Sequence, residues 1–246
     1  MNTVALPLLD DPAALWYLNR ATGLVLLVLF SLALLLGQLA TARTATGRVP
    51  RFVSLELHRN VTLVAVGLLV VHVSSAVIDN YVDISLLDAV VPGRSPYRPV
   101  WLALGTLALD VGIVVGLTTL VRHRLPYGTW RLTHYLAYLC WPLAVVHGLG
   151  TGTDTRRQWV LVVTFGCVAV VLFGLLVRLT AIPGLPGVAR LALGAVVVAM
   201  PLLASLWLRT GPLQPDWSRR AGTPPPANAP AQPTSTQPTS SAPGQR

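Results

Sequence analysis

Four histidines at matched spacing are the residues of this sequence most able to do chemistry. His58 and His72 share one apolar stretch at the spacing i, i+14, and His134 and His147 share another at the spacing i, i+13. A histidine inside a membrane-length apolar stretch is costly unless it has a partner. At about 1.5 Å per residue, each helix would hold its two imidazoles ~20 Å apart along its axis. In a hydrocarbon core ~30 Å thick, one histidine of each helix would then lie near each membrane face.

Two such helices side by side would form two facing histidine pairs, one in each leaflet. Opposed imidazoles are a standard axial ligation for the iron of a b-type haem. The pattern therefore predicts two haem b groups, with all four histidines as iron ligands. The alternative is a non-haem membrane protein, such as a transporter or a proton or metal relay, that uses these imidazoles together with Asp110. Asp110 stands in the middle of another apolar stretch, where an ionised carboxylate is expensive.

The composition indicates an integral membrane protein. Hydrophobic residues make up 53% of the 246 positions and charged residues only 11%, which is far too apolar for a soluble domain. The net charge is +9, but the arginines lie in short loops between apolar stretches rather than in one basic patch. We interpret them as topology signals and partners for lipid or haem, and expect no nucleic-acid binding.

The apolar stretches predict an all-α bundle of six membrane-spanning helices. A short polar lead-in covers residues 1–14, and the six spans occupy residues 15–209. From residue 210 to residue 246 the composition changes to Pro, Thr, Ser, Ala and Gln, which predicts a disordered tail. The expected spans are about 15–42, 52–78, 100–121, 130–150, 159–179 and 188–208.

The arginines also predict an orientation in the cell membrane. The loops after the first, third and fifth spans contain no acidic residue and hold eight arginines: Arg43, Arg48, Arg51, Arg122, Arg124, Arg131, Arg178 and Arg190. By the positive-inside rule these loops are cytoplasmic and both termini are extracytoplasmic. His58 and His134 would then lie near the cytoplasmic face, and His72 and His147 near the outer face.

The helical wheel adds a constraint on the fourth span. At about 100° per residue, a 14-residue step brings His72 to within ~40° of His58, whereas a 13-residue step leaves His147 ~140° away from His134. The fourth helix must therefore twist or bend. Pro142 lies between the two histidines, and a proline inside a helix commonly kinks it. We expect Pro142 to help aim both imidazoles.

The paired spacings, together with the segment WYLNRATG at the start of the first span, resemble the ferric reductase-like transmembrane domain. That family includes ferric reductases, NADPH oxidases and the bacterial haem-binding membrane subunit of a methionine sulfoxide reductase system. The resemblance covers roughly residues 15–179. It implies that His58 and His134 ligate an inner haem b, and that His72 and His147 ligate an outer one.

Three arginines are candidates to meet haem propionates. Arg59 and Arg131 are near the inner pair in the sequence, and Arg20 is near the outer face. Arginines at helix ends also serve as plain interface anchors, so both interpretations stay open.

The function that these patterns and the resemblance imply is transmembrane electron transfer from a cytoplasmic-side donor to an extracytoplasmic acceptor. No glycine-rich dinucleotide fingerprint follows the last span. We therefore expect the haem-binding membrane component of an oxidoreductase system, with a separate flavin-dependent or other reductase as its electron donor.

Overall fold

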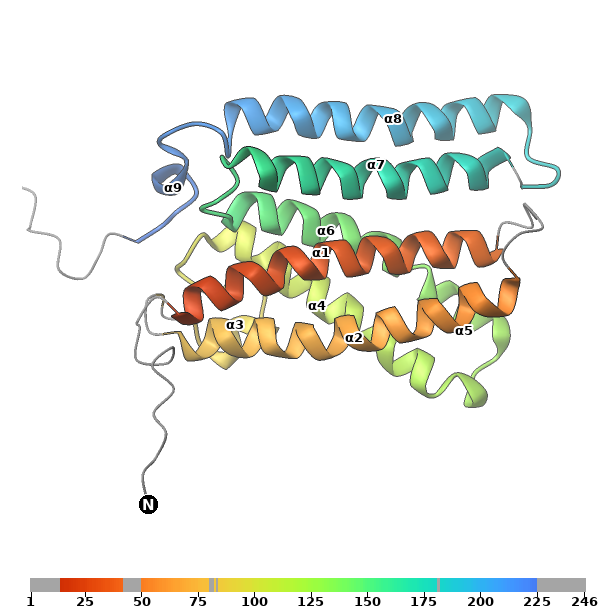
Figure 1. Cartoon of the computed structure of the whole chain (residues 1–246), viewed down its shortest axis with the longest axis horizontal. Helices are drawn as coiled ribbons and strands as arrows, with labels where there is room; N and C mark the ends of the chain where they lie inside the picture. The colour runs from red at the N-terminus through yellow and green to blue at the C-terminus, as the bar shows by residue number, and fades with distance from the viewer. Residues whose placement is uncertain (1–13, 42–49, 80–81, 83, 181, 225–246) are drawn as a thin grey trace, which may run out of the picture.

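The computed structural model describes residues 14–41, 50–79, 82, 84–180 and 182–224, and these residues contain helices and no strand. The long helices lie side by side along one axis (Figure 1). The helices are α1 (Ala14–Thr41), α2 (Arg51–Ile78), α3 (Leu86–Val90), α4 (Pro99–Leu120), η1 (Arg122–Arg124), α5 (Tyr127–His134), α6 (Ala137–Thr151), α7 (Gln158–Thr180), α8 (Gly187–Thr210) and α9 (Trp217–Arg220).

Prolines set the starts of several of these helices. Pro50 and Pro186 immediately precede α2 and α8, Pro126 precedes α5, and Pro99 is the first residue of α4. Proline suits these positions because its fixed φ fits the helix start and its missing N–H has no intrahelical partner there. These prolines therefore mark the positions at which α2, α4, α5 and α8 begin.

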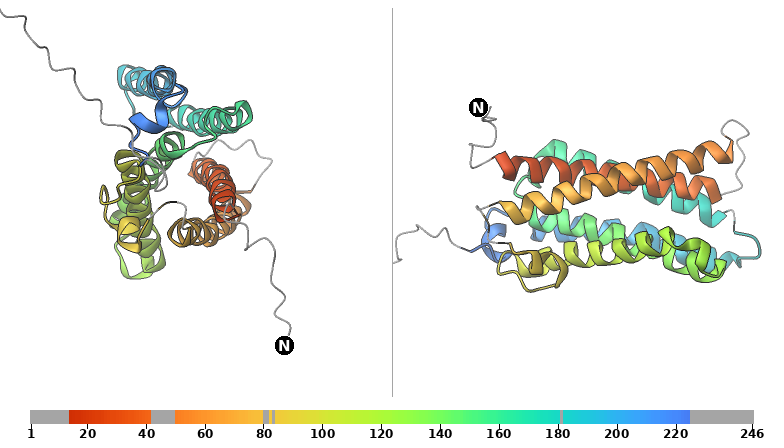
Figure 2. Two further views of the ribbon diagram at one scale, coloured as in Figure 1. Left: turned by 90° about the vertical axis from the view of Figure 1, so that its left-hand side faces the viewer. Right: turned by 90° about the horizontal axis from the view of Figure 1, so that it is seen from below.

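Helix α1 packs along α2, α7 and α6, while α4 packs along α6 and α8 packs along α7. The view down the bundle in Figure 2 separates the pair α1 and α2 from α4, α5 and α6, with α7 and α8 beside them. The core joins Trp141, Val145 and Leu149 of α6 to Val171 of α7 and Leu208 of α8.

The outer faces of the bundle are apolar. Val64, Leu117, Val162 and Leu203 come from four different helices, and each is about 60% exposed. Of the described helices, α1, α2, α4, α7 and α8 are each long and apolar enough to cross a membrane. This architecture is that of an all-helical protein with several candidate membrane spans, in agreement with the expected class.

The fourth expected span, residues 130–150, is not one continuous helix. It is divided into α5 and α6 at Tyr135 and Leu136, directly after His134. The amides of Tyr135, Leu136, Tyr138 and Leu139 each bond the carbonyl three residues earlier, which is the tighter 3₁₀ pattern. The break therefore lies at residues 135–136, and Pro142 sits inside α6. The interruption of the fourth span therefore precedes Pro142, and the role of Pro142 in aiming the imidazoles stays a prediction.

The 3₁₀ turn explains how a 13-residue step can serve a histidine pair. Each 3₁₀ residue turns the chain by about 120°, against about 100° in an α-helix. Each such step after His134 adds about 20° of rotation and therefore moves His147 from its ~140° offset towards the ~40° offset of His58 and His72 on α2.

The ordered chain also extends beyond the expected boundary of the tail. Residues 211–224 follow α8, form α9 and return to the bundle end, where the Gly222 carbonyl accepts a hydrogen bond from the Arg98 amide (3.0 Å). The tail boundary at residue 210 is therefore placed too early. Residues 225–246 and all but the last residue of the lead-in lie outside the described residues.

Candidate functional site

His58 of α2 and His134 at the end of α5 face each other across the bundle. Their ring centroids are 6.2 Å apart and their planes are inclined at 74°. An imidazole nitrogen binds a transition metal at about 2.0–2.1 Å, and the nitrogen lies about 1.1 Å from the ring centre. One metal ion between two imidazoles would thus separate their centroids by roughly 6 Å, close to the separation present here.

Three of the four histidines are held by a main-chain carbonyl at Nδ1. The distances are 2.8 Å from His58 to Ala33 O, 3.1 Å from His72 to Asn19 O and 2.9 Å from His147 to Trp101 O. A carbonyl oxygen only accepts, so each Nδ1 carries the proton and each Nε2 keeps its lone pair. Metal-binding histidines commonly have this arrangement, because the bond fixes both the tautomer and the ring orientation.

Each of these carbonyls is followed four residues later by a glycine that lies against the imidazole. A Cβ on Gly37 would lie 3.5 Å from His58, one on Gly23 would lie 3.1 Å from His72, and one on Gly105 would lie 2.5 Å from His147. The helix therefore offers both an acceptor and the space for a ring at each site. We call these three sets the carbonyl–glycine seats: Ala33 with Gly37, Asn19 with Gly23, and Trp101 with Gly105.

The seats could have been recognised from their spacing in the sequence. Gly23 and Gly37 have the spacing i, i+14 in α1, which is the same interval as that of His58 and His72 in the antiparallel α2. Glycines within an apolar stretch are easily overlooked, because they fit its composition without standing out.

His134 has a different environment. Its ring stacks on Trp130 with the centroids 5.3 Å apart and the planes 26° apart. Its Nδ1 is buried and has no hydrogen-bond partner among the described residues, and the same is true of Trp130 Nε1. Packing against an aromatic ring, rather than a carbonyl, therefore orients this imidazole.

His72 and His147 both lie at the opposite end of the bundle from His58 and His134. Consecutive residues of α1 contact both neighbourhoods. The Asn19 carbonyl accepts from His72, and Arg20 Nη2 donates to the carbonyl of Thr151, one turn beyond His147 (3.0 Å). The structure thus brings His58 and His134 together as expected, and it places His72 and His147 at the same end of the bundle.

The three candidate arginines differ in where they lie. Arg20 contacts the end of α6 beside the His72 and His147 pair and also lies over the Trp16 ring at 5.5 Å. Arg131 is exposed and lies over the rings of Tyr127 and Tyr135 at 5.8 Å and 6.0 Å. Arg59 is exposed. Of the three, it is Arg20 whose position is fixed by hydrogen bonds close to a histidine pair.

Arg98 is a further positioning residue, and nothing in the sequence pattern marks it. It is 2% exposed and precedes α4 in the left-handed conformation (φ 42°), which is uncommon for a residue other than glycine. Its Nη1 donates to the carbonyls of Gly150 (3.1 Å) and Thr151 (2.9 Å). Arg98 and Arg20 therefore both hold the end of the helix that carries His147.

Asp110 does not join the histidines. It is half-buried in α4, and no three His, Cys, Asp or Glu side chains of the described chain converge on a point where they could hold a metal ion by themselves.

The part of the chain that holds these pairs also matches a known protein family. A family model described as a domain of unknown function, DUF8596, matches residues 14–154, which run from the start of α1 to just beyond α6. Searches of curated proteins and of solved structures find no match. Because the family model covers more than half of the chain and includes all four histidines, the protein belongs to the DUF8596 family.

Proposed function

We propose that this protein carries electrons across a membrane through two b-type haems. His58 and His134 would hold one haem, and His72 and His147 the other. The observation that carries the proposal is the geometry of the first pair, whose ring centroids are 6.2 Å apart on two helices. The resemblance of the sequence to the ferric reductase-like transmembrane domain points the same way.

The surroundings of the pairs support this choice of group. Three imidazoles present Nε2 because their Nδ1 protons are bonded to main-chain carbonyls. Helix α2 buries only Ser54, Ala65 and Ser75 among its described side chains, so the sides of the helix that flank His58 and His72 are open to a flat apolar ligand. A bound haem would supply an iron that alternates between ferrous and ferric states, and the four histidines of the chain would hold it.

The proposed topology has six crossings, of which α5 and α6 together make the fourth. Helix η1, α5 and the turn between α7 and α8 lie at one end of the bundle (Figure 1), and five of the eight arginines lie in or beside these segments. This end would be cytoplasmic, with both termini outside. A separate flavin-dependent or other reductase would supply electrons here, and an extracytoplasmic acceptor would remove them.

Orientation is tested by placing a cysteine near the C-terminus, at Ser240. An impermeant maleimide added to whole cells should label Ser240→Cys. Labelling only after the cells are opened would reverse the orientation, and would exchange the haem that receives electrons with the haem that delivers them.

A visible spectrum of the purified, haem-replete protein tests the function. Reduction with dithionite should give the sharp bands of a low-spin haem with two histidine ligands. His123, an exposed residue of η1, supplies the matched control. His123→Ala should leave the spectrum unchanged, whereas His58→Ala should remove about half of its intensity. A purified protein without haem bands would exclude the proposal and favour a non-haem relay or transporter.

A further inference from the structure

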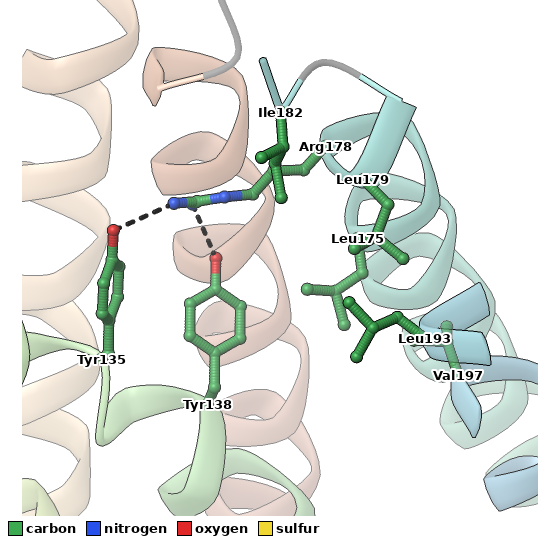
Figure 3. A pocket seen from close by; sticks show the side chains of 8 residues that line it. All are labelled: Tyr135, Tyr138, Leu175, Arg178, Leu179, Ile182, Leu193 and Val197. Atoms are coloured by element: carbon green, nitrogen blue, oxygen red, sulfur yellow. Dashed lines mark hydrogen bonds between the residues drawn. The ribbon is translucent and has the colours of Figure 1, made fainter. Parts of the chain in front are cut away.

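A groove opens on the side of the bundle at the end opposite α9, and none of the four histidines lines it. Its volume is about 240 Å³, and it is lined by residues of α6, α7 and α8 and by Tyr135 and Ile182 beside them. Figure 3 shows the Arg178 guanidinium reaching across the groove to the phenols of Tyr135 and Tyr138. The remaining lining residues are aliphatic: Leu175, Leu179, Ile182, Leu193 and Val197.

The polar end of this groove contains hydrogen-bond donors that no described residue uses. Arg178 Nη1 donates to Tyr138 Oη (3.2 Å) and to Thr41 Oγ1 (3.0 Å), and Nη2 donates to Tyr135 Oη (3.2 Å). Each phenol oxygen accepts from the guanidinium and keeps its own O–H proton. Neither phenol donates that proton to a described residue. Two hydroxyl donors and one cation therefore gather at a single point.

The positive charge at this point has no carboxylate partner in the described chain. The described chain has three ion pairs, and their cations are Arg94, Arg157 and Arg220. Arg178 is half-buried, so part of its hydration is lost. A guanidinium in such a place is stabilised by an anion, and Arg binds phosphate especially well because its N–H groups form a fixed fork.

The aliphatic part of the groove determines what kind of anion fits. Leu193 is 45% exposed and Ile182 is 37% exposed. The aliphatic wall of the groove is therefore open on the outer surface of the bundle. An inorganic phosphate would gain nothing from this wall, whereas an acyl chain would bury apolar surface along it. Basic pockets between helices on the cytoplasmic side are also where anionic lipid headgroups bind.

We propose that this groove binds one anionic phospholipid, with its phosphate on Arg178, Tyr135 and Tyr138. One acyl chain would lie along α7 and α8. The site needs only the membrane environment and does not depend on the proposed haem chemistry.

The experiment is to place the protein in phosphatidylcholine nanodiscs that contain a minor fraction of phosphatidylglycerol, and to measure retained lipid by native mass spectrometry. The wild type should retain one phosphatidylglycerol. Arg178→Gln should weaken retention by at least about tenfold, because it removes the charged hydrogen-bond donor to the phosphate. Tyr135→Phe with Tyr138→Phe keeps both rings and should also weaken it.

Arg124→Gln is the matched control, because it removes one exposed arginine of η1 at the same end of the bundle. It should retain the lipid, and the haem spectrum should be the same in all of these variants. Equal retention of phosphatidylcholine and phosphatidylglycerol by the wild type would overturn the proposal. Displacement of the lipid by millimolar inorganic phosphate would also overturn it, since the groove would then be a simple anion site.

Discussion

At the scale of single residues, the candidate site depends on repetition of one small unit. A helix carbonyl accepts the Nδ1 proton of an imidazole, and the glycine four residues later leaves room for the ring. Two of these carbonyl–glycine seats have the spacing i, i+14 in α1, which is about four full helical turns. The seats therefore lie nearly on one face of α1, opposite the two histidines of α2.

Gly105 provides a direct test of the seats. Gly105→Ala would place a Cβ 2.5 Å from Nδ1 of His147, so the imidazole must move away from the Trp101 carbonyl. Crowding of this kind costs about 1–3 kcal/mol. We expect the haem held by His72 and His147 to be lost or weakened, as measured by haem content of the purified protein.

Gly116 of the same helix is the matched control, since no atom lies within 4 Å of its added Cβ. Gly116→Ala should keep both haems and raise stability by about 0.5–1 kcal/mol, because alanine is the better helix former. If Gly105→Ala and Gly116→Ala behave alike, the seat at Gly105 has no role in holding His147.

The facing of His58 and His134 was predictable from the sequence, because residue type and spacing along single helices are enough to suggest it. The partner carbonyls were not, because every residue type has a carbonyl and only the packing of α1 on α2 selects Asn19 and Ala33. Arg98 was missed for the same reason. Its partners are carbonyls of Gly150 and Thr151, more than fifty residues away along the chain.

At the scale of elements, the 3₁₀ turn between α5 and α6 determines the direction of His147. Replacing Pro142 by Ala should leave both haems in place, since the overwound segment lies before this residue. The variant should also melt at a higher temperature, because a proline inside a helix costs about 3 kcal/mol. Haem content and a thermal melt of Pro142→Ala check both expectations.

Insertion of one alanine after Leu136 is the complementary change. It would rotate α6 by about 100° relative to His134 and should abolish at least one histidine pair. Loss of haem in Pro142→Ala, together with retention in the insertion variant, would restore Pro142 as the residue that aims the imidazoles.

The short helix α3 contains a carboxylate that makes its stability depend on pH. Asp88 accepts hydrogen bonds from the amide (2.8 Å) and hydroxyl (2.8 Å) of Ser85, and lies 3.4 Å from Arg94. These bonds, the amide first, lower the pKa of Asp88 below its ordinary value of 3.8. Because the folded pKa is the lower one, the stabilisation is complete above 3.8 and disappears as the pH falls through the folded value.

Hydrogen exchange of residues 86–90, corrected for the intrinsic rates, should therefore show protection that falls only at acid pH. Asp88→Asn cannot titrate and should lose this pH dependence. Equal pH profiles for the wild type and Asp88→Asn would show that the ionised carboxylate does not stabilise α3.

At the scale of the whole molecule, residues 211–224 close the bundle end beside His147. Trp217 packs with its ring centroid 5.1 Å from that of Trp101 and donates its indole N–H to the Gly150 carbonyl (2.9 Å). Arg98 Nε donates to Thr223 Oγ1 (2.8 Å). The segment thus contacts Trp101, whose own carbonyl holds His147.

Truncation after Thr210 should therefore destabilise the protein by at least about 3 kcal/mol, from the loss of aromatic packing and buried hydrogen bonds. Truncation after Pro224 keeps all of these contacts and serves as the control. Thermal melts of the two truncated proteins test the point, and equal melting temperatures would contradict a structural role for residues 211–224.

The helical class was predictable because membrane-length apolar stretches dominate the composition. The division of the fourth span was not, since local 3₁₀ hydrogen bonding around Tyr135 and Leu136 has no proline or glycine to signal it. The order of residues 211–224 was hidden in the same way. Their composition predicts disorder, but Trp217 packs against both Trp101 and Trp207.

The most direct test of the central proposal is the number of haems per chain. A pyridine haemochrome assay on haem-replete protein, set against protein concentration from amino-acid analysis, should give two haems b per chain. His72→Ala should reduce this to about one and spare the His58 and His134 pair. One haem or none in the wild type, or two in the His72→Ala variant, would contradict the assignment of the four histidines to two haems.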